Sequence, residues 1–172
     1  MLRILAQALR TGLVTEPAAA CDDAALATAG INLKRRLDAR LGRSLAIRMV
    51  DAGSCNGCEL EVHALNNPYY DLERFGIQFV ASPRHADALM VSGPVSRQME
   101  AALRRTWRAT PSPKLVIAIG DCACGGGAFG ASYACRGSIE QVLPVDLTIP
   151  GCPPAPIDLL RGLLALFERS GS

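Results

Sequence analysis

The sequence predicts an α/β protein built on a parallel sheet with helices on both of its faces. Two observations favour this class: short, continuous apolar runs recur along the chain, and segments with helical periodicity lie between them. Composition gives a third observation, because 49% of the 172 residues are apolar, which is enough to bury a substantial core. One main domain is therefore expected.

The first part of the chain predicts helices and no strand. Residues 1–13 carry leucines close to one face of a short amphipathic helix, which is expected to dock on a membrane subunit or another neighbour. Residues 17–30 are rich in alanine and other small residues and are expected to be a linker. Leucines at four-residue spacing then predict a helix over residues 32–41.

We expect residues 1–43 to be a helical extension and linker that contacts a neighbouring subunit, and residues 44–172 to be the α/β domain. Apolar runs predict the strands of this domain at residues 45–50, 77–80, 88–92, 115–119 and 145–149. Helical patterns separate or follow them at residues 58–65, 96–108 and 157–167. Such alternation implies parallel pairing of the strands.

Charge and hydropathy exclude several classes of protein. Lys and Arg number 18 against 16 Asp and Glu, so the concentrated basic face of a nucleic-acid-binding protein is not expected. The short basic run at residues 34–36 is interpreted as a solvated or subunit-facing helix surface. No apolar run reaches the ~18 residues of a membrane span, and residues 1–13 lack the pattern of a secretory signal. We therefore expect a cytoplasmic protein.

The cysteines are numerous and unevenly placed. Their number is seven, which in a reducing compartment indicates metal or redox chemistry rather than a disulfide framework. One pair follows the first predicted strand, a second pair follows the fourth, and a single cysteine follows the fifth: Cys55 and Cys58, Cys122 and Cys124, and Cys152. Loops that follow parallel strands emerge at the same carboxyl edge of the sheet, so these cysteines are expected to converge.

Four converging thiolates are the usual protein ligands of a [4Fe–4S] cluster. Glycines around the cysteines let the backbone approach such a group closely. A thioredoxin-like redox pair would leave Cys122 and Cys152 unexplained, and a zinc site usually has two C-x₂-C pairs, whereas here the second half is divided between two loops. Cys21 and Cys135 are interpreted as buried, inert cysteines. Spacing alone does not choose between Cys122 and Cys124.

Five motifs give the chain a resemblance to a known family. They are GSCNGCELE (53–61), PYYDLERFGI (68–77), SPRHADALMVSGPV (82–95), GDCACGGGAFG (120–130) and LPVDLTIPGCPPAP (143–156). Together they resemble the small, electron-transferring subunit of membrane-bound, energy-converting [NiFe] hydrogenases of the formate hydrogenlyase type. That family is homologous to the B subunit of respiratory complex I. The fold that this resemblance implies is a flavodoxin-like parallel sheet whose carboxyl-edge loops bind the cluster.

The resemblance also implies the ligand set. One [4Fe–4S] cluster would be held by Cys55, Cys58, Cys122 and Cys152, and Cys124 falls at a position that is usually not a ligand. Complex I subunits of this type carry two adjacent cysteines in the first motif, whereas Asn56 and Gly57 separate the pair here, as in the hydrogenases. No catalytic residue is expected on this chain.

The implied role is that of an electron carrier within an oxidoreductase complex. Electrons would pass between a [NiFe] site in a large partner subunit and a ferredoxin-like iron–sulfur subunit, with membrane subunits completing the complex. The chain would then lie on the inner face of the cell membrane. One alternative is a complex I-like or hydrogenase-related NADH/quinone oxidoreductase subunit that works without a nickel site. Another, of a different class, is a zinc-stapled structural module.

A few further residues are candidates for supporting roles. Glu59 and Glu61 follow the first cysteine pair and are expected either to line a proton or subunit-contact path or simply to favour a helix N-terminus. Arg84 is expected to offset the cluster's negative charge, to mark a subunit interface, or to be a surface residue. His85 is interpreted as structural. The side chains expected at a partner interface or in the core are Phe129 and Tyr133.

Overall fold

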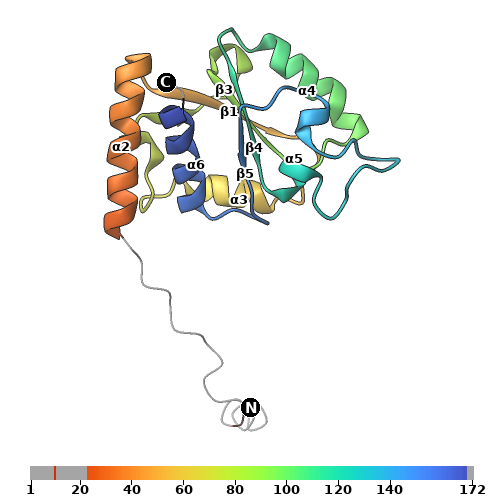
Figure 1. Cartoon of the computed structure of the whole chain (residues 1–172), viewed down its shortest axis with the longest axis horizontal. Helices are drawn as coiled ribbons and strands as arrows, with labels where there is room; N and C mark the ends of the chain where they lie inside the picture. Colours follow the sequence, from red (N-terminus) through yellow and green to blue (C-terminus); the bar gives the residue numbers. More distant parts are fainter. Residues whose placement is uncertain (1–9, 11–22, 170–172) are drawn as a thin grey trace.

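The protein is described by a computed structural model that covers residue 10 and residues 23–169 (Figure 1). The predicted helix over residues 1–13, apart from residue 10, and Cys21 lie outside these described residues. Five strands form one sheet in the order β2-β1-β3-β4-β5, and every neighbouring pair is parallel. The predicted α/β class is therefore confirmed, and the strand order is that of flavodoxin-like folds.

The strands lie within two residues of their predicted positions: β1 (Leu45–Asp51), β2 (Ile77–Phe79), β3 (Ala88–Ser92), β4 (Leu115–Ile119) and β5 (Leu147–Ile149). The helices are α2 (Asp23–Leu41), α3 (Gly57–Ala64), α4 (Arg97–Ala109), α5 (Asp121–Gly125) and α6 (Pro156–Arg169). Short 3₁₀ turns cover Leu72–Phe75, Pro83–His85 and Ile139–Gln141. The sequence did not predict α5, because a five-residue helix that ends in glycines has no apolar periodicity.

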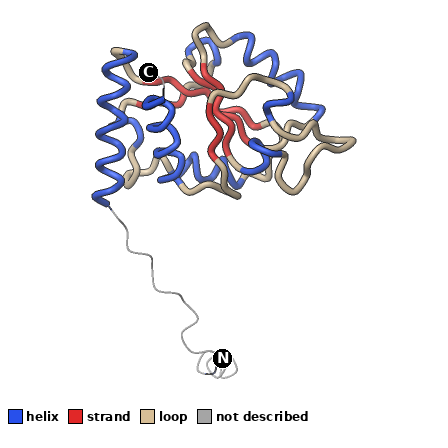
Figure 2. The backbone as a smooth tube through the Cα atoms, viewed as in Figure 1, coloured by secondary structure: helices blue, strands red, loops and turns tan. Residues whose placement is uncertain are grey.

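Helices cover both faces of the sheet, as predicted (Figures 1 and 2). Successive strand residues point to opposite faces. Ile47, Met90 and Ile117 therefore pack in one core cluster with α2, α3 and α6. Leu89 and Val116 pack in a second cluster against α4, α5 and the turn that precedes β5. With a core on each face, the sheet forms a rigid middle layer.

Helix α2 is longer than predicted, and the expected linker over residues 17–30 is wrong from Asp23 onward. Alanine is the best helix former, so the alanine-rich run extends the helix instead of breaking it. Leu26, Leu33 and Leu37 are buried on the side that contacts α6. A Cβ on Gly30 would lie 2.2 Å from the ring of Phe75, so this glycine permits close packing and does not mark a helix end.

The register aligns the carboxyl ends of the central strands. Asp51 pairs with Ser92, Ser92 with Ile119, and Ile119 with Ile149, so four residues form one row across the sheet. The chain leaves this row in three loops, which carry the cysteines three or four positions further along. The sheet thus fixes where each cysteine loop begins.

Among the helices of residues 23–169, none combines the length and the apolar character that crossing a bilayer requires.

Candidate functional site

The loop after β1 is shaped by the aspartate that ends the strand. Asp51 Oδ1 accepts hydrogen bonds from the backbone N–H groups of Gly53 at 2.7 Å and Ser54 at 2.8 Å. Gly53 has a φ of +115°, a conformation that L side chains rarely adopt. The turn delivers Cys55 to the exposed end of the sheet.

The second cysteine lies at the start of a helix. Asn56 adopts the left-handed conformation with a φ of 72°, which asparagine tolerates better than most residues, and α3 begins at the next position. Cys58 is therefore in the first turn of α3 and is half-buried. Its position at the helix N-terminus favours negative charge on the sulfur.

Glu59 joins this cysteine loop to the end of β3. Its Oε1 accepts a hydrogen bond from Ser54 Oγ at 2.7 Å and a second, shorter one from Ser92 Oγ. Ser54 Oγ in turn accepts from the backbone N–H of Asn56 at 3.1 Å. The other carboxylate oxygen, Oε2, is buried without a hydrogen-bond partner among the described residues. Leaving a buried carboxylate oxygen unpaired costs stability.

The loop after β4 lies against Cys58. Gly120 has a φ of +85°, and a Cβ at this position would lie 2.5 Å from Cys58 Sγ. A Cβ on Gly127 would lie 2.7 Å from Cys122 Sγ. Side chains at these two positions would therefore occupy the space that the sulfurs occupy, and glycine is required both for this close approach and for the positive φ.

The loop after β5 is tied to the loop after β4. The N–H of Asp121 donates to the carbonyl of Gly151 at 2.9 Å, and the N–H of Gly151 donates to Asp121 Oδ1 at 2.8 Å. The exposed Cys152 follows directly. A Cβ on Gly57 would lie 3.6 Å from Cys55 Sγ and 3.9 Å from Pro153, so the first and last loops also meet.

Electrostatic coupling indicates that four sulfurs share one region. Burial raises the pKa of Cys58 to about 12, and the carboxylate of Glu59 and negative charge on Cys55, Cys122 and Cys152 add to the effect. The pKa of Cys122 is raised by burial and then by charge on Cys152 and Cys55. Negative charge on all four thiols is thus mutually unfavourable, and a positively charged group among them would relieve it.

Cys124 points elsewhere. It packs against the core cluster on the α4 side of the sheet, and its Sγ donates to the carbonyl of Ala118 at 3.7 Å. Burial raises its pKa to about 11, and none of the other cysteines contributes to that shift. Cys135 is half-buried in the loop after α5, where its backbone pairs with that of Ser96.

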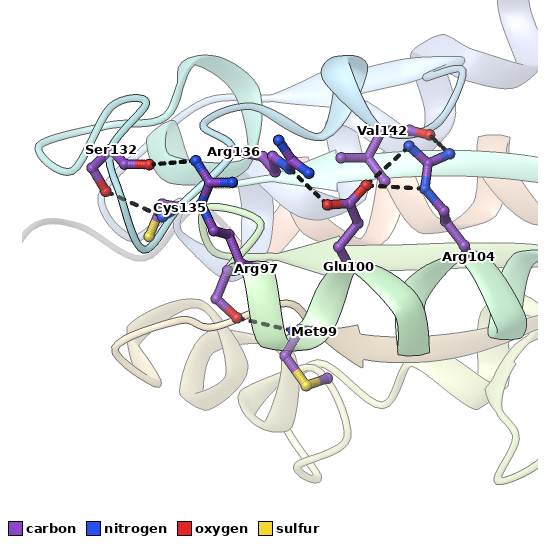
Figure 3. A network of polar contacts seen from close by, with 9 residues as sticks. Arg97, Met99, Glu100, Arg104, Ser132, Cys135, Arg136 and Val142 are labelled. Carbon is purple, nitrogen blue, oxygen red and sulfur yellow. Dashed lines mark hydrogen bonds and ion pairs between the residues drawn. The ribbon is translucent and has the colours of Figure 1, made fainter.

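That loop is fastened to α4 by ion pairs and hydrogen bonds (Figure 3). Arg97 donates to the carbonyl of Ser132 at 3.3 Å. Glu100 accepts from Arg136 Nε at 2.6 Å and from Arg104 Nε at 3.2 Å. Because the same loop carries Gly127 beside Cys122, the network steadies one wall of the cysteine site.

The remaining predicted residues are not all brought together. Glu61 is half-buried on α3, two positions beyond Glu59. Phe129 and Tyr133 are 58% and 93% exposed, so the expectation of core packing is wrong for both. Arg84 and His85 line a cavity at the opposite, amino edge of the sheet. The prediction that Arg84 offsets charge at the cysteines does not fit this position.

Sequence reasoning missed several residues that hold the cysteine loops, namely Asp51, Ser54, Ser92 and Asp121. The signal for Asp51 and Asp121 was present, because each lies at the boundary between a strand and a glycine-containing loop, where aspartate commonly accepts backbone hydrogen bonds. Ser92 gave no such signal, since its partner Glu59 is distant in sequence and only the parallel register places them together.

Within the described part of the chain, no three or more His, Cys, Asp or Glu side chains are grouped closely enough to hold a single metal ion.

Comparison with known proteins gives consistent results. A probable membrane-bound hydrogenase subunit of Pyrococcus furiosus is 43% identical over 143 residues, which cover 79% of this chain and 86% of that protein. Formate hydrogenlyase subunit 7 of Escherichia coli is 44% identical over 141 residues, or 80% of this chain and 55% of that protein. The B subunit of the NADH-quinone oxidoreductase of Desulfovibrio desulfuricans is 47% identical over 111 residues, or 64% of this chain and 60% of that protein.

This chain therefore spans between half and two thirds of the length of two of these relatives and most of the third. Among solved structures, a chain of the membrane-bound sulfane sulfur reductase, an archaeal respiratory membrane complex, is similar with a TM-score of 0.66 and 33% identity. The match covers 82% of this chain and 76% of that one. The relatives are subunits of oxidoreductase complexes, as the sequence motifs predict. Residues 55–166 match the model of one family, and the chain belongs to it: the 20 kDa subunit family of NADH ubiquinone oxidoreductase.

Proposed function

We propose that this chain holds one [4Fe–4S] cluster and carries electrons inside a membrane-associated hydrogenase complex. The ligands would be Cys55, Cys58, Cys122 and Cys152. The single observation that carries the proposal is the convergence of the three cysteine loops at one edge of the sheet, where Gly120 lies against Cys58 Sγ and two hydrogen bonds between Asp121 and Gly151 join the other two loops. When bound, the cluster supplies one-electron transfer; every other part of the task falls to the protein.

The residues present fit such a group. Four thiolates form its usual ligand set, and glycines stand where side chains would collide with two of the sulfurs. A four-cysteine zinc site usually draws on two C-x₂-C pairs. Here only Cys55 and Cys58 form such a pair, and the other two ligands would come from separate loops. This distribution favours a cluster over the zinc-stapled alternative.

The protein's contribution is rigidity. Three loops leave one row of the sheet. Asp121 and Gly151 bind the loops after β4 and β5 to each other, and Glu59 binds the loop after β1 to β3. Ligands held in this way move little when charge enters or leaves the site, which keeps the cost of reorganisation low. Glu59 is proposed to position the first cysteine loop, and Glu61 to lie toward a partner subunit.

The cysteine edge is also the proposed face for the catalytic large subunit. Leu60 is 61% exposed on α3, two positions after Cys58, and the exposed Phe129 and Tyr133 belong to the loop that follows α5. Exposed apolar side chains on the elements that carry the ligands are typical of a subunit interface. A ferredoxin-like subunit would receive or supply the electrons, and membrane subunits would hold the complex at the inner face of the membrane.

Anaerobic purification with iron and sulfide analysis tests the proposal. About four irons and four sulfides per chain are expected, with a low-spin signal in electron paramagnetic resonance after reduction. The matched variants are Cys152→Ser, which should lose the intact cluster, and Cys135→Ser, which should keep it. Stoichiometric zinc without sulfide would instead support the structural module.

A second candidate is an oxidoreductase subunit that works beside a large subunit lacking nickel. The observation in its favour is the 47% identity to the B subunit of an NADH-quinone oxidoreductase. The nickel ligands would belong to the partner, so the neighbouring large-subunit gene decides the matter. Two C-x-x-C pairs in that gene, with nickel in the purified complex, support the hydrogenase; absence of both supports the second candidate.

A further inference from the structure

A cavity that does not belong to the cysteine site lies at the amino edge of the sheet. It has a volume of about 520 Å³, within the range of small-molecule sites. It opens between the end of α2, the 3₁₀ turn before β3, the segment before β4 and the end of α6. The cysteines emerge at the other edge, so this cavity has no part in holding a cluster.

The walls of the cavity are apolar. Leu45 and Leu115 contribute the first residues of β1 and β4, and Leu41 the last residue of α2. Phe167, near the end of α6, closes another side. Walls of this kind accept hydrocarbon and offer few groups that would recognise a polar backbone.

The rim is cationic. Arg43, Arg84, His85 and Lys114 line the cavity together with a single acid, Asp87. That acid is already neutralised, because it accepts two hydrogen bonds from the Arg43 guanidinium at 2.6 and 2.8 Å. Arg84 is exposed, and its guanidinium makes no hydrogen bond or ion pair with any described residue. Among the described residues, Lys114 Nζ donates only to backbone carbonyls, so Arg84 and Lys114 are two positive charges that no carboxylate of the rim neutralises.

The adjoining helix extends the same sign of charge. Lys34, Arg35 and Arg36 are exposed on α2, which runs into the cavity wall at Leu41. None of the three forms an ion pair with a described residue. A basic surface beside an apolar pocket is complementary to a lipid that has an anionic head and hydrocarbon tails.

We propose that this cavity binds an anionic phospholipid, with the acyl chain between the leucines and the phosphate on Arg84. The site would give the chain its own contact with a membrane surface or with a lipid retained in a membrane-bound assembly. It is independent of the cluster, because the lining contains none of the cysteines. A failure of the lipid proposal would therefore leave the cluster proposal untouched, and the reverse also holds.

Trp107 supplies the probe for the experiment. It is the only tryptophan of the chain, and Lys114 Nζ lies 4.1 Å from the centroid of its ring. Lys114 also lines the cavity, so a brominated lipid seated against Lys114 is expected to quench the indole fluorescence. The full-length protein is mixed with vesicles of brominated phosphatidylcholine, with or without phosphatidylglycerol. Quenching is expected only where phosphatidylglycerol is present.

Two charge variants distinguish binding at the cavity from nonspecific electrostatic attraction to anionic vesicles. Arg84→Gln is expected to weaken binding about fivefold, since one cation near an anionic surface contributes roughly that much. Arg105→Gln removes the same charge from an exposed position on α4 outside the cavity and is the matched control. Equal weakening by both variants would overturn the proposal, because the attraction would then be nonspecific.

A competition experiment tests whether the site recognises a phospholipid or phosphate alone. Glycerol 3-phosphate is added as a competitor at the concentration at which the vesicles saturate binding. Short-chain phosphatidylglycerol is the second competitor. If glycerol 3-phosphate released the protein from the vesicles as effectively as this lipid does, the site would recognise phosphate alone and the lipid proposal would be wrong. Absence of quenching with anionic vesicles, or a segment of a partner protein filling the cavity in the assembled complex, would also overturn it.

Discussion

Asp121 and Gly151 hold each other by two hydrogen bonds that run in opposite directions, one at 2.9 Å from the aspartate N–H and one at 2.8 Å to its carboxylate. The same arrangement recurs at the other edge of the sheet. There the N–H of Asp146 donates to the carbonyl of Val116 at 2.9 Å, and the N–H of Val116 donates to Asp146 Oδ2 at 2.7 Å. The repeated contact stabilises neighbouring segments at both ends of β4, but only the first lies beside cysteines.

This pair yields a matched comparison. Asp121→Ala and Asp146→Ala each remove one hydrogen bond to a backbone N–H and should each lower the free energy of unfolding by about 1 kcal/mol. Only Asp121→Ala should shorten the lifetime of the cluster, because only it weakens the contact between the Cys152 loop and the Cys122 loop. The measurement is the decay of cluster absorbance under an iron chelator, with chemical denaturation as the control. Equal decay in the two variants would contradict this role for Asp121.

Glu59 gives a second prediction. Glu59→Ala leaves the hydroxyls of Ser54 and Ser92 without their acceptor and should destabilise the protein by roughly 1–3 kcal/mol. Glu59→Gln keeps an acceptor oxygen and should retain most of the cluster. Iron content per chain and thermal unfolding are the measurements. Glu61→Ala, on the same helix, is the control and should leave the isolated chain close to wild type.

Substitutions of the two cysteines after β4 should have opposite effects on cluster content. Cys122→Ser is expected to lose one ligand and with it the intact cluster. Cys124→Ala should keep about four irons, because its sulfur packs in the core cluster on the α4 side and not with the four proposed ligands. Its cost is a small loss of stability from the removed sulfur. A Cys124→Ala protein without iron would show that the ligand set is assigned wrongly.

A pH dependence follows from Glu100. Its hydrogen bond with Arg136 is the main cause that lowers its pKa below the usual carboxyl value. A lowered pKa in the folded state means that the stabilisation is present above the ordinary carboxyl pKa and is lost as the pH falls through the lowered one. Glu100→Gln mimics the protonated form at neutral pH. We expect it to speed hydrogen exchange in residues 130–137 while leaving the strands unchanged.

The control for that experiment is the wild-type protein, in which exchange in this loop should be slow at neutral pH. Arg136→Gln should reproduce the effect of Glu100→Gln, since both remove the ion pair at 2.6 Å. The double variant should be no worse than either single one. Additive effects would mean that the two residues stabilise the loop separately.

Much of this protein is readable in its sequence. Apolar runs with helical segments between them determine a parallel sheet, because strands of this kind are buried on both faces. The placement of cysteines after three of those strands determines that they share an edge. Local patterns suffice for both conclusions, since period and loop position are properties of short stretches of chain.

The tertiary structure alone decided the rest. It showed that Cys124 lies apart from the other thiols and that Arg84 lies at the amino edge of the sheet. It also placed Ser92 against Glu59 and extended α2 across the predicted linker. Each outcome depends on which way a side chain points or on a partner distant in sequence. The pairing register of β1 with β3 and the packing of α2 on α6 set those relations, and no stretch of local sequence encodes them.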